Sequence, residues 1–265
     1  MLRYFGGKWA FAPWIIEHFP PHRIYVEPFG GAASVLLRKP QSSVEVYNDL
    51  DEEIVGIFRA IQDPRDCAAL MRRLRRTPYS RREFEHAFQP SRDPLIRATR
   101  AIVRAYQSFH HSSLFGARFS RTFASAKHRA TSISKAREWA TYPRALVAAS
   151  RRLQGVILEC RDAFEVIRDQ DSPDTLFFID PPYVPATRGQ GGYRYELTTD
   201  EHRTLLILLR DLKGMVVLAG YPNALYDEIL HDWHKTEKRV RAQGSKRSRT
   251  EVLWISPRAW SRERP

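Results

Sequence analysis

The chain has 265 residues, of which 43% are hydrophobic, so it can bury the core of one large α/β domain, with or without an insertion. No apolar run is long enough to span a membrane, and the start of the chain, with Arg3 and Lys8 among aromatic residues and glycines, is not a signal peptide. Lys and Arg number 43 against 30 Asp and Glu, and the net charge of +13 favours a polyanionic partner, nucleic acid ahead of an anionic membrane.

The first stretch, residues 1–61, is typical of the start of an α/β domain. The segments "HRIYVEPF" at 22–29 and "SSVEVYND" at 42–49 predict two strands. Each is followed by a segment that predicts a helix, "AASVLLRK" at 32–39 and "EEIVGIFRAI" at 52–61.

The middle stretch, residues 62–153, has a different pattern. Apolar residues recur at helical spacing in "CAALMRRLRR" at 67–76 and "DPLIRATRAIVRAYQSF" at 93–109, and runs typical of strands are scarce. Arginines crowd this stretch, and its centre, at 110–132, is polar, basic and aromatic without a clear period. The pattern predicts a mostly helical, basic insertion.

The last stretch, residues 154–265, returns to α/β alternation. Strands are predicted at 155–160, 175–180 and 214–220, and helices at 200–212 and 222–230, the second of which Pro222 could start.

Two further strand candidates, "HKTEKRVRA" at 234–242 and "TEVLWIS" at 250–256, flank the basic loop "QGSKRSR" and could pair as a terminal hairpin. The simplest architecture is a doubly wound sheet formed by residues 1–61 and 154–265 and split by the helical insertion at 62–153.

Ligands of such sheets bind beyond the carboxyl ends of the strands, and four strand ends carry unusual residues. The first is "VEPFGGAASV", where Glu27 closes the strand, Phe29 helps to shape the turn, and Gly30 and Gly31 let the backbone approach a ligand closely. It is neither a GxGxxG motif nor a phosphate loop, and a tight strand-to-helix connection is the alternative interpretation.

Acidic residues follow two further predicted strands. Asp49 stands where it could accept hydrogen bonds from ribose hydroxyls, although Asp49 or Asp51 could instead cap the following helix. Asp162 stands where it could meet the amino group of an adenine, with helix capping at least as good an explanation. Together these strand ends suit an adenosine-like cofactor that is positively charged and lacks phosphate.

The fourth strand end is "DPPY". Asp180 leaves the core, and Pro181 and Pro182 stiffen the turn because each fixes its own φ angle. The Asp180 carboxylate and the Pro181 carbonyl are two acceptors for the two N–H bonds of an adenine amino group, and Tyr183 can stack on the ring. The alternative is a proline-rich turn with a packed tyrosine.

In "DPPY" at 180–183, "EPFGGAASV" at 27–35 and "RYFGGK" at 3–8, and in the order of these motifs, the chain resembles the Dam-like DNA adenine-N6 methyltransferases. The resemblance implies a Rossmann-like methyltransferase sheet with an inserted, mostly helical target-recognition domain. It also implies transfer of a methyl group from S-adenosylmethionine to N6 of adenine in DNA. By the same resemblance, Tyr4, Lys8, Asp49 and Asp180 contact the cofactor; no particular target sequence is implied.

The sulfonium methyl group is already activated, so this chemistry requires no metal, and catalysis would consist of positioning and hydrogen-bond polarisation of the amine. Cys67 and Cys160 are far apart and, like the histidines, form no metal site; two cysteines favour a reducing, intracellular setting. Duplex DNA must present its adenine by base flipping, which costs a few kcal/mol. The candidate phosphate-binding clusters are Arg118, Arg121, Lys127 and Arg129 in the insertion and Lys246, Arg247 and Arg249 in the terminal loop.

Three other functions remain open from the sequence: an RNA adenine methyltransferase, a DNA-binding relative without catalysis, and a different Rossmann-type enzyme such as a dehydrogenase. The intact "DPPY" weighs against the second, and the missing GxGxxG against the third. We expect a cytoplasmic, nucleoid-associated protein. The recognised DNA site, any partner restriction nuclease and the oligomeric state are not encoded in a recognisable motif.

Overall fold

A computed structural model describes residues 7–108, 119, 135–184, 194–241 and 248–261. The chain divides into two compact units. The α/β unit comprises residues 8–50 and 155–265, and the helical unit comprises residues 1–7 and 51–154. The helix at 52–61, which the sequence pattern grouped with the first α/β stretch, therefore belongs to the helical unit.

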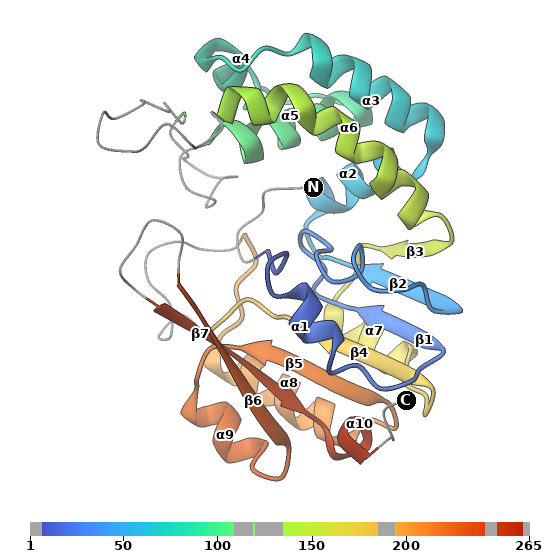
Figure 1. Cartoon of the computed structure of the whole chain (residues 1–265), viewed down its shortest axis with the longest axis vertical. Helices are drawn as coiled ribbons and strands as arrows, with labels where there is room; N and C mark the ends of the chain where they lie inside the picture. Colours follow the sequence, from blue (N-terminus) through green and yellow to red (C-terminus); the bar gives the residue numbers. More distant parts are fainter. Residues whose placement is uncertain (1–6, 109–118, 120–134, 185–193, 242–247, 262–265) are drawn as a thin grey trace. The chain divides into compact units, whose positions relative to one another are not determined.

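The α/β unit is built on a seven-stranded sheet with the order β3-β2-β1-β4-β5-β7-β6. The first five strands are parallel, and β7 runs antiparallel to both β5 and β6. The strands are β1 (Ile24–Glu27), β2 (Val44–Asn48), β3 (Val156–Glu159), β4 (Thr175–Ile179), β5 (Met215–Gly220), β6 (His234–Arg241) and β7 (Ser248–Ile255) (Figure 1). The predicted doubly wound sheet and the predicted terminal hairpin are confirmed.

Helices of the α/β unit accompany this sheet: α1 (Ala12–Ile16), α7 (Ala163–Asp169), α8 (Thr199–Asp211), α9 (Ala224–Ile229) and α10 (Pro257–Ser261). A capping box begins α8, in which Thr198 and Glu201 bind each other's backbone N–H groups. Pro222 does not start α9; the helix begins after Asn223, whose side chain accepts from the Leu225 N–H.

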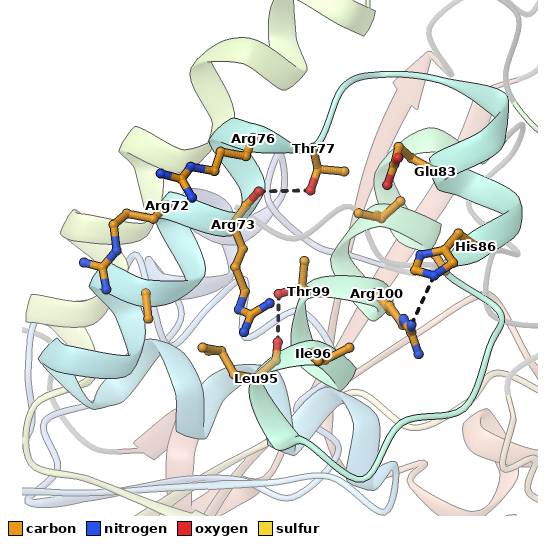
Figure 2. Close-up of a pocket in the computed structure, with 13 residues that line it drawn as sticks. Arg72, Arg73, Arg76, Thr77, Glu83, His86, Leu95, Ile96, Thr99 and Arg100 are labelled. Atoms are coloured by element: carbon orange, nitrogen blue, oxygen red, sulfur yellow. Dashed lines mark hydrogen bonds between the residues drawn. The ribbon is translucent and has the colours of Figure 1, made fainter.

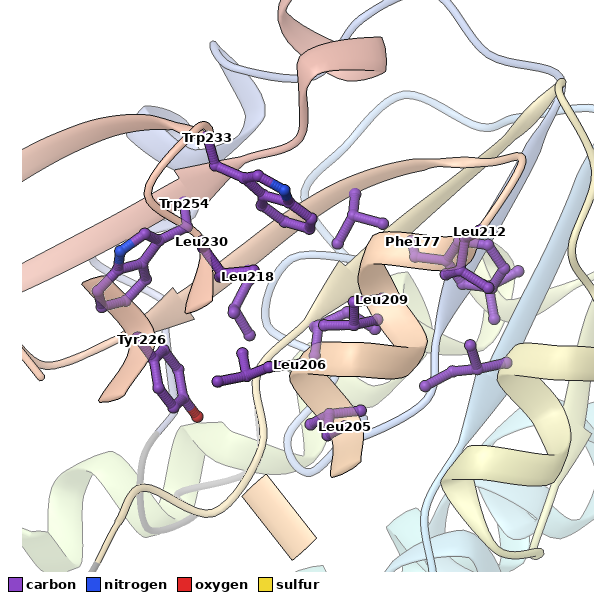
Figure 3. Close-up of a cluster of buried hydrophobic side chains, with 14 of the residues drawn as sticks. Phe177, Leu205, Leu206, Leu209, Leu212, Leu218, Tyr226, Leu230, Trp233 and Trp254 are labelled. Carbon is purple, nitrogen blue, oxygen red and sulfur yellow. The ribbon is translucent and has the colours of Figure 1, made fainter. Parts of the chain in front are cut away.

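One hydrophobic core lies between α8, α9 and the sheet. Leu205, Leu206 and Leu209 of α8 are buried together with Phe177 of β4 and Trp254 of β7 (Figure 3). Burying a leucine or phenylalanine side chain contributes roughly 1.5–3 kcal/mol, so this cluster holds β4, and the site residues that follow it, in a rigid frame.

The prediction of a helix at 32–39 is wrong, because the chain forms successive turns there. Ala33 adopts a φ of 49°, which interrupts the right-handed repeat that a helix needs. The N–H of Leu36 is bound by the carboxyl group of Glu27 and not by a carbonyl of a preceding turn. The glycine-rich segment is therefore a compact loop that folds back on the end of β1.

The helical unit contains α2 (Glu52–Gln62), α3 (Pro64–Arg76), α4 (Arg81–His86), α5 (Pro94–Gln107) and α6 (Lys135–Leu153). An Asp-Pro pair begins both α3 and α5, where Asp63 and Asp93 cap the first turn and proline occupies the first helical position. The helix predicted at 67–76 is confirmed within α3, and the helix predicted at 93–109 is confirmed over 94–107. In the described parts of the chain, no helix is long and apolar enough to cross a membrane.

Candidate active site

The site residues gather where the strand order of the α/β unit reverses. β1 and β4 are neighbours, but the chain continues from β1 to β2 on one side and from β4 to β5 on the other. Ligands of open α/β sheets bind at such a switch point, beyond the carboxyl ends of the strands. "EPFGG" follows β1 and "DPPY" follows β4, so the two motifs flank this point from adjacent strands (Figure 1).

The glycine turn after β1 packs against an aromatic ring of β2. A Cβ atom on Gly30 would lie 2.0 Å from the ring of Tyr47, so a side chain is excluded at this position. The Tyr47 hydroxyl donates to the Gly31 carbonyl at 2.7 Å, and Gly31 adopts a φ of 47°. The turn therefore needs glycine both for space and for backbone conformation.

Asp49 binds this same turn. Its Oδ2 accepts from the N–H of Gly31 at 2.8 Å, and the side chain is half-buried. Helix α2 is capped by Asp51, whose side chain accepts from the N–H of Glu53. Of the two residues that could have capped this helix, Asp51 is therefore the one that does. Asp49 thus lies at the end of β2 beside the glycine turn, where its predicted contact with a ribose is not excluded by a capping role.

Asp162, by contrast, caps a helix. Its Oδ1 accepts from the N–H groups of Phe164 at 2.8 Å and Glu165 at 3.3 Å at the start of α7. This is the alternative that the sequence left open for this residue. Its contact with an adenine stays a prediction. The role of Phe29 in the cofactor site also stays a prediction; its side chain is partly buried and packs on the hydrophobic core.

Glu27 is almost completely buried, with 3% of its surface exposed. Its Oε2 accepts from the Tyr25 hydroxyl at 2.9 Å and from the Leu36 N–H at 3.1 Å. Burial raises the pKa of Glu27 to about 8; the Tyr25 hydrogen bond opposes this rise, and the nearby charge of Asp180 adds to it. Glu27 therefore holds the loop after β1 in place. Its binding of the cofactor stays a prediction, and the side chain would have to act from this buried position.

Asn48 joins three strand ends, a role that was not expected from the sequence. Its amide nitrogen donates to the carbonyls of Pro28 at 2.9 Å and Arg161 at 3.0 Å, and its oxygen accepts from the Arg161 N–H at 2.9 Å. The side chain is fully buried at the end of β2. An asparagine at the end of a predicted strand, just before Asp49, is the signal that could have indicated it.

Asp180 forms a buried ionic cluster with Lys8 and Glu251. The Lys8 Nζ lies 3.1 Å from Oδ1 of Asp180 and 3.2 Å from Oε1 of Glu251, and it also lies 4.5 Å from the centre of the Tyr183 ring. The Tyr183 hydroxyl donates to Oε1 of Glu251. The structure therefore brings Lys8, Asp180 and Tyr183, three of the predicted residues, into one network.

The charge state of Asp180 is set by opposing influences. Desolvation raises the pKa of Asp180 to about 6, the Lys8 ammonium lowers it, and the Glu251 carboxylate raises it. At neutral pH the group is mostly ionised, and an ionised carboxylate is a hydrogen-bond acceptor only. The carboxylate can therefore accept a hydrogen bond from an N–H group of a ligand at the end of β4.

Glu251 is the second site residue that was not expected from the sequence. It lies within "TEVLWIS", which was predicted only as a strand of the hairpin, and it is 3% exposed just before the buried Val252 and Leu253. An acid that directly precedes an apolar run in a predicted strand needs a partner if it is buried, and this was the available signal. Tyr221 also joins the site, where its ring meets that of Tyr183 edge-on at 4.5 Å.

Several predicted residues lie outside the described part of the chain: Tyr4, Arg118, Arg121, Lys127, Arg129, Lys246 and Arg247. Arg249 lies in β7, but its side chain is likewise outside the described part. Among the described residues, no cluster of three or more His, Cys, Asp or Glu side chains is arranged to hold a metal ion.

Together the fold and these contacts define a doubly wound α/β protein with an acidic site at its switch point. The model of the D12 class N6 adenine-specific DNA methyltransferase family matches residues 4–242. The chain therefore belongs to this family. The match confirms the predicted resemblance, and the family's description, an N6 adenine-specific DNA methyltransferase, agrees with the predicted class of enzyme.

The chain is also similar to a solved structure, the crystal structure of the SAM-dependent methyltransferase from Agrobacterium tumefaciens, with 12% sequence identity and a TM-score of 0.43. The similarity covers 96% of this chain but only 63% of that one, so this chain spans less than two thirds of that protein's length. No curated protein sequence matches this chain significantly.

Proposed function

We propose that this chain methylates N6 of adenine in double-stranded DNA, with Asp180 and the Pro181 carbonyl as acceptors for the target amine. The observation that carries the proposal is the position of Asp180. It follows β4 at the switch point, it is held by the Lys8 ammonium, and its turn is stiffened by Pro181 and Pro182.

The residues at the switch point fit S-adenosylmethionine. Its ribose hydroxyls and its cationic sulfonium match carboxylates, and Asp49 and Asp180 follow β2 and β4, the two strands that flank β1. The space beside Tyr47 admits only glycine at position 30, which keeps side chains away from the turn. When bound, the cofactor supplies a methyl group that is already activated for transfer to nitrogen.

The residues of this chain would orient the amine and polarise it. A carboxylate at Asp180 would accept a hydrogen bond from an N–H of the amino group and raise the electron density on its nitrogen. This favours a nitrogen lone pair directed at the methyl donor. The buried ring of Tyr183 contacts Lys8 and Tyr221, and it would stack on the flipped base; base–aromatic stacking is worth roughly 1–3 kcal/mol per base. That energy offsets part of the cost of flipping the adenine out of the duplex.

The helical unit would serve as the target-recognition domain, because its described helices are rich in arginine and the family acts on DNA. A nucleoid-associated enzyme in the cytoplasm is consistent with such a substrate.

The test is methyl transfer from labelled S-adenosylmethionine to duplex DNA and to RNA of matched sequence, followed by digestion to nucleosides. We expect N6-methyladenine in the DNA. Label only in RNA, or on cytosine, would overturn the proposal, whereas Asp180→Asn with parental activity would refute the assignment of Asp180 alone.

A further inference from the structure

The helical unit contains a pocket of about 640 Å³ between α3, α4 and α5. Arg72, Arg73 and Arg76 of α3 line one side of it, and Arg100 of α5 and His86 of α4 line the other (Figure 2). We refer to this pocket as the arginine groove. The lining contains four arginines and one acidic residue, Glu83, so the groove is strongly positive.

The three arginines of α3 that line the groove have no acidic partner in the described part of the chain. Other arginines of the helical unit do: Arg104 pairs with Glu53 at 2.6 Å, and Arg97 pairs with Glu52 at 3.7 Å. Three exposed guanidinium groups therefore remain available for an external anion.

Arg100 is held more firmly. Its Nη1 donates to the carbonyls of Gln89 at 2.8 Å and Pro90 at 3.0 Å, which fixes the guanidinium at the edge of the groove. Leu95 and Ile96 contribute a half-buried aliphatic surface beside it (Figure 2). The groove thus combines one anchored cation and three exposed cations around an apolar lining, and arginine forks match phosphate oxygens in a bidentate manner.

We propose that the arginine groove binds the sugar–phosphate backbone of the DNA that carries the target adenine. The positive charge of the groove favours a polyanion as its occupant. Arg72, Arg73 and Arg76 lie at positions i, i+1 and i+4 of one helix, so their guanidinium groups can meet successive phosphates of one strand. The inference rests on the proposed function, and it adds a phosphate-binding surface to the basic segments outside the described residues.

The experiment compares two triple variants by fluorescence anisotropy with a labelled duplex over a range of salt concentrations. Arg72→Gln, Arg73→Gln and Arg76→Gln remove the groove's exposed cations. The matched control carries Arg59→Gln, Arg65→Gln and Arg75→Gln, which removes the same charge from exposed positions of α2 and α3 that do not line the groove.

We expect the groove variant to reduce the slope of log K against log salt by about 0.9 for each phosphate that the protein no longer neutralises, and the control to leave most of the slope intact. Equal effects of the two variants would overturn the proposal, since the change would then reflect overall charge. A parental slope in the groove variant would overturn it as well. Binding of inorganic phosphate or pyrophosphate to the parent, with unchanged DNA affinity in the groove variant, would identify a small anion as the occupant instead.

These outcomes can be separated from failure of the proposed function. Binding of S-adenosylmethionine by calorimetry and the chemical identity of the methylated base do not depend on the groove. A parent protein that methylates DNA while the groove variant binds DNA normally refutes only the groove.

A different observation concerns Glu251, whose ion pair and hydrogen bond with described residues lie within the α/β unit. Its carboxylate is nearly buried and receives both the Lys8 ammonium and the Tyr183 hydroxyl. Lys8 is thereby shared between Glu251 and Asp180 at nearly equal distances, 3.2 and 3.1 Å.

We infer that Glu251 is a positioning residue, which holds Lys8 and Tyr183 against Asp180 without touching the substrate. The titratable groups that face Asp180 come from several elements: Lys8, Glu27 of β1, Tyr183, Tyr226 of α9 and Glu251 of β7. Removing the Glu251 charge removes one of the two carboxylates that share Lys8, and with it a like charge near Asp180. Both changes favour the ionised form of Asp180.

The test is the acid limb of the pH–rate profile together with a ¹³C NMR titration of the Asp180 carboxyl group. Glu251→Gln should move the midpoint below that of the parent, and Lys8→Met should move it above. Glu251→Asp, which keeps the charge, should restore the parental midpoint more closely than Gln. Glu237→Gln, on the neighbouring strand β6, is the control for an exposed carboxylate.

A midpoint in Glu251→Gln equal to that of the parent, or a shift in the direction of Lys8→Met, would overturn the role of Glu251. The NMR titration does not require turnover, so it remains informative if the reaction differs from the one proposed. Circular dichroism establishes that each variant is folded.

Discussion

The Nζ of Lys8 lies 3.1 Å from Oδ1 of Asp180, and this ion pair joins the beginning of the described chain to the exit of β4. Both side chains are largely buried, at 6% and 17% exposure. A buried charge without a partner is strongly unfavourable, so each of the two charges stabilises the other in the site. The pair also sets the protonation state of the carboxylate proposed to bind the target amine.

Asp180→Asn tests that carboxylate directly. The amide can donate as well as accept, so part of the attraction to the amine becomes repulsion. Removing one such transition-state hydrogen bond typically costs about 2.7–4 kcal/mol, and we expect single-turnover methyl transfer to fall about a hundred- to a thousandfold. A parental rate in the variant would show that "DPPY" is only a stiff turn.

The pH dependence of the parent enzyme follows from the same group. The pKa of Asp180 is raised from its ordinary 3.8 to about 6, mainly by burial. The carboxylate becomes protonated as the pH falls through about 6, so methyl transfer should decline below this value while remaining nearly level above it. A pH–rate profile at saturating cofactor measures this, and an acid limb near pH 4 would contradict it.

Tyr183 offers a test of stacking. Tyr183→Ala removes the ring and should reduce both methyl transfer and trapping of the flipped base, which 2-aminopurine fluorescence at the target position reports. Tyr183→Phe keeps the ring but removes the hydroxyl bond to Glu251, and we expect it to keep much of the activity. Equal decreases in both variants would indicate that the hydroxyl, rather than the ring, matters.

Glu27 should influence stability more than chemistry. With its pKa raised from 4.5 to about 8, the folded state retains a proton that the unfolded state loses. Its contribution to the free energy of unfolding is thus full below about pH 4.5 and is lost as the pH rises through about 8. Glu27→Gln should remove this decline, as denaturant unfolding at several pH values would show.

Glu27→Leu is the contrasting variant. It leaves the Tyr25 hydroxyl and the Leu36 N–H without their acceptor, and each unsatisfied buried donor costs about 1–3 kcal/mol. A Leu variant as stable as the Gln variant at neutral pH would contradict this account.

Gly30→Ala should destabilise the α/β unit, because the new Cβ would lie 2.0 Å from the Tyr47 ring and force the turn or the ring to move. Overpacking of this kind typically costs about 1–3 kcal/mol. Gly56→Ala is a matched control: nothing lies within 4 Å of its added Cβ in α2, and alanine is favoured over glycine in a helix by about 1 kcal/mol. Thermal unfolding should show opposite shifts, and a stabilised Gly30→Ala protein would refute the packing argument.

The sequence by itself determined the order of the elements and the identity of the motifs. Alternating strand and helix patterns indicated the doubly wound sheet, and the prolines after Asp180 indicated a stiff exit turn, because these signals depend on residues close together in the chain. The local sequence pattern gave a wrong prediction at 32–39, where a helix was expected. There the left-handed φ of Ala33 and the reach of Glu27 to Leu36 depend on how the chain folds back over β1.

Only the tertiary structure decided which distant residues share the site. Glu251 lies in a strand that the sequence assigned to a hairpin, and it reaches Lys8 and Tyr183 because β7 inserts beside β5 in the sheet. Asn48 likewise joins the ends of β1 and β3, which come together through strand pairing rather than through proximity in sequence. Ion pairs and hydrogen bonds act over a few ångströms in space, so these partners follow from sheet order and register, which no local pattern of residues specifies.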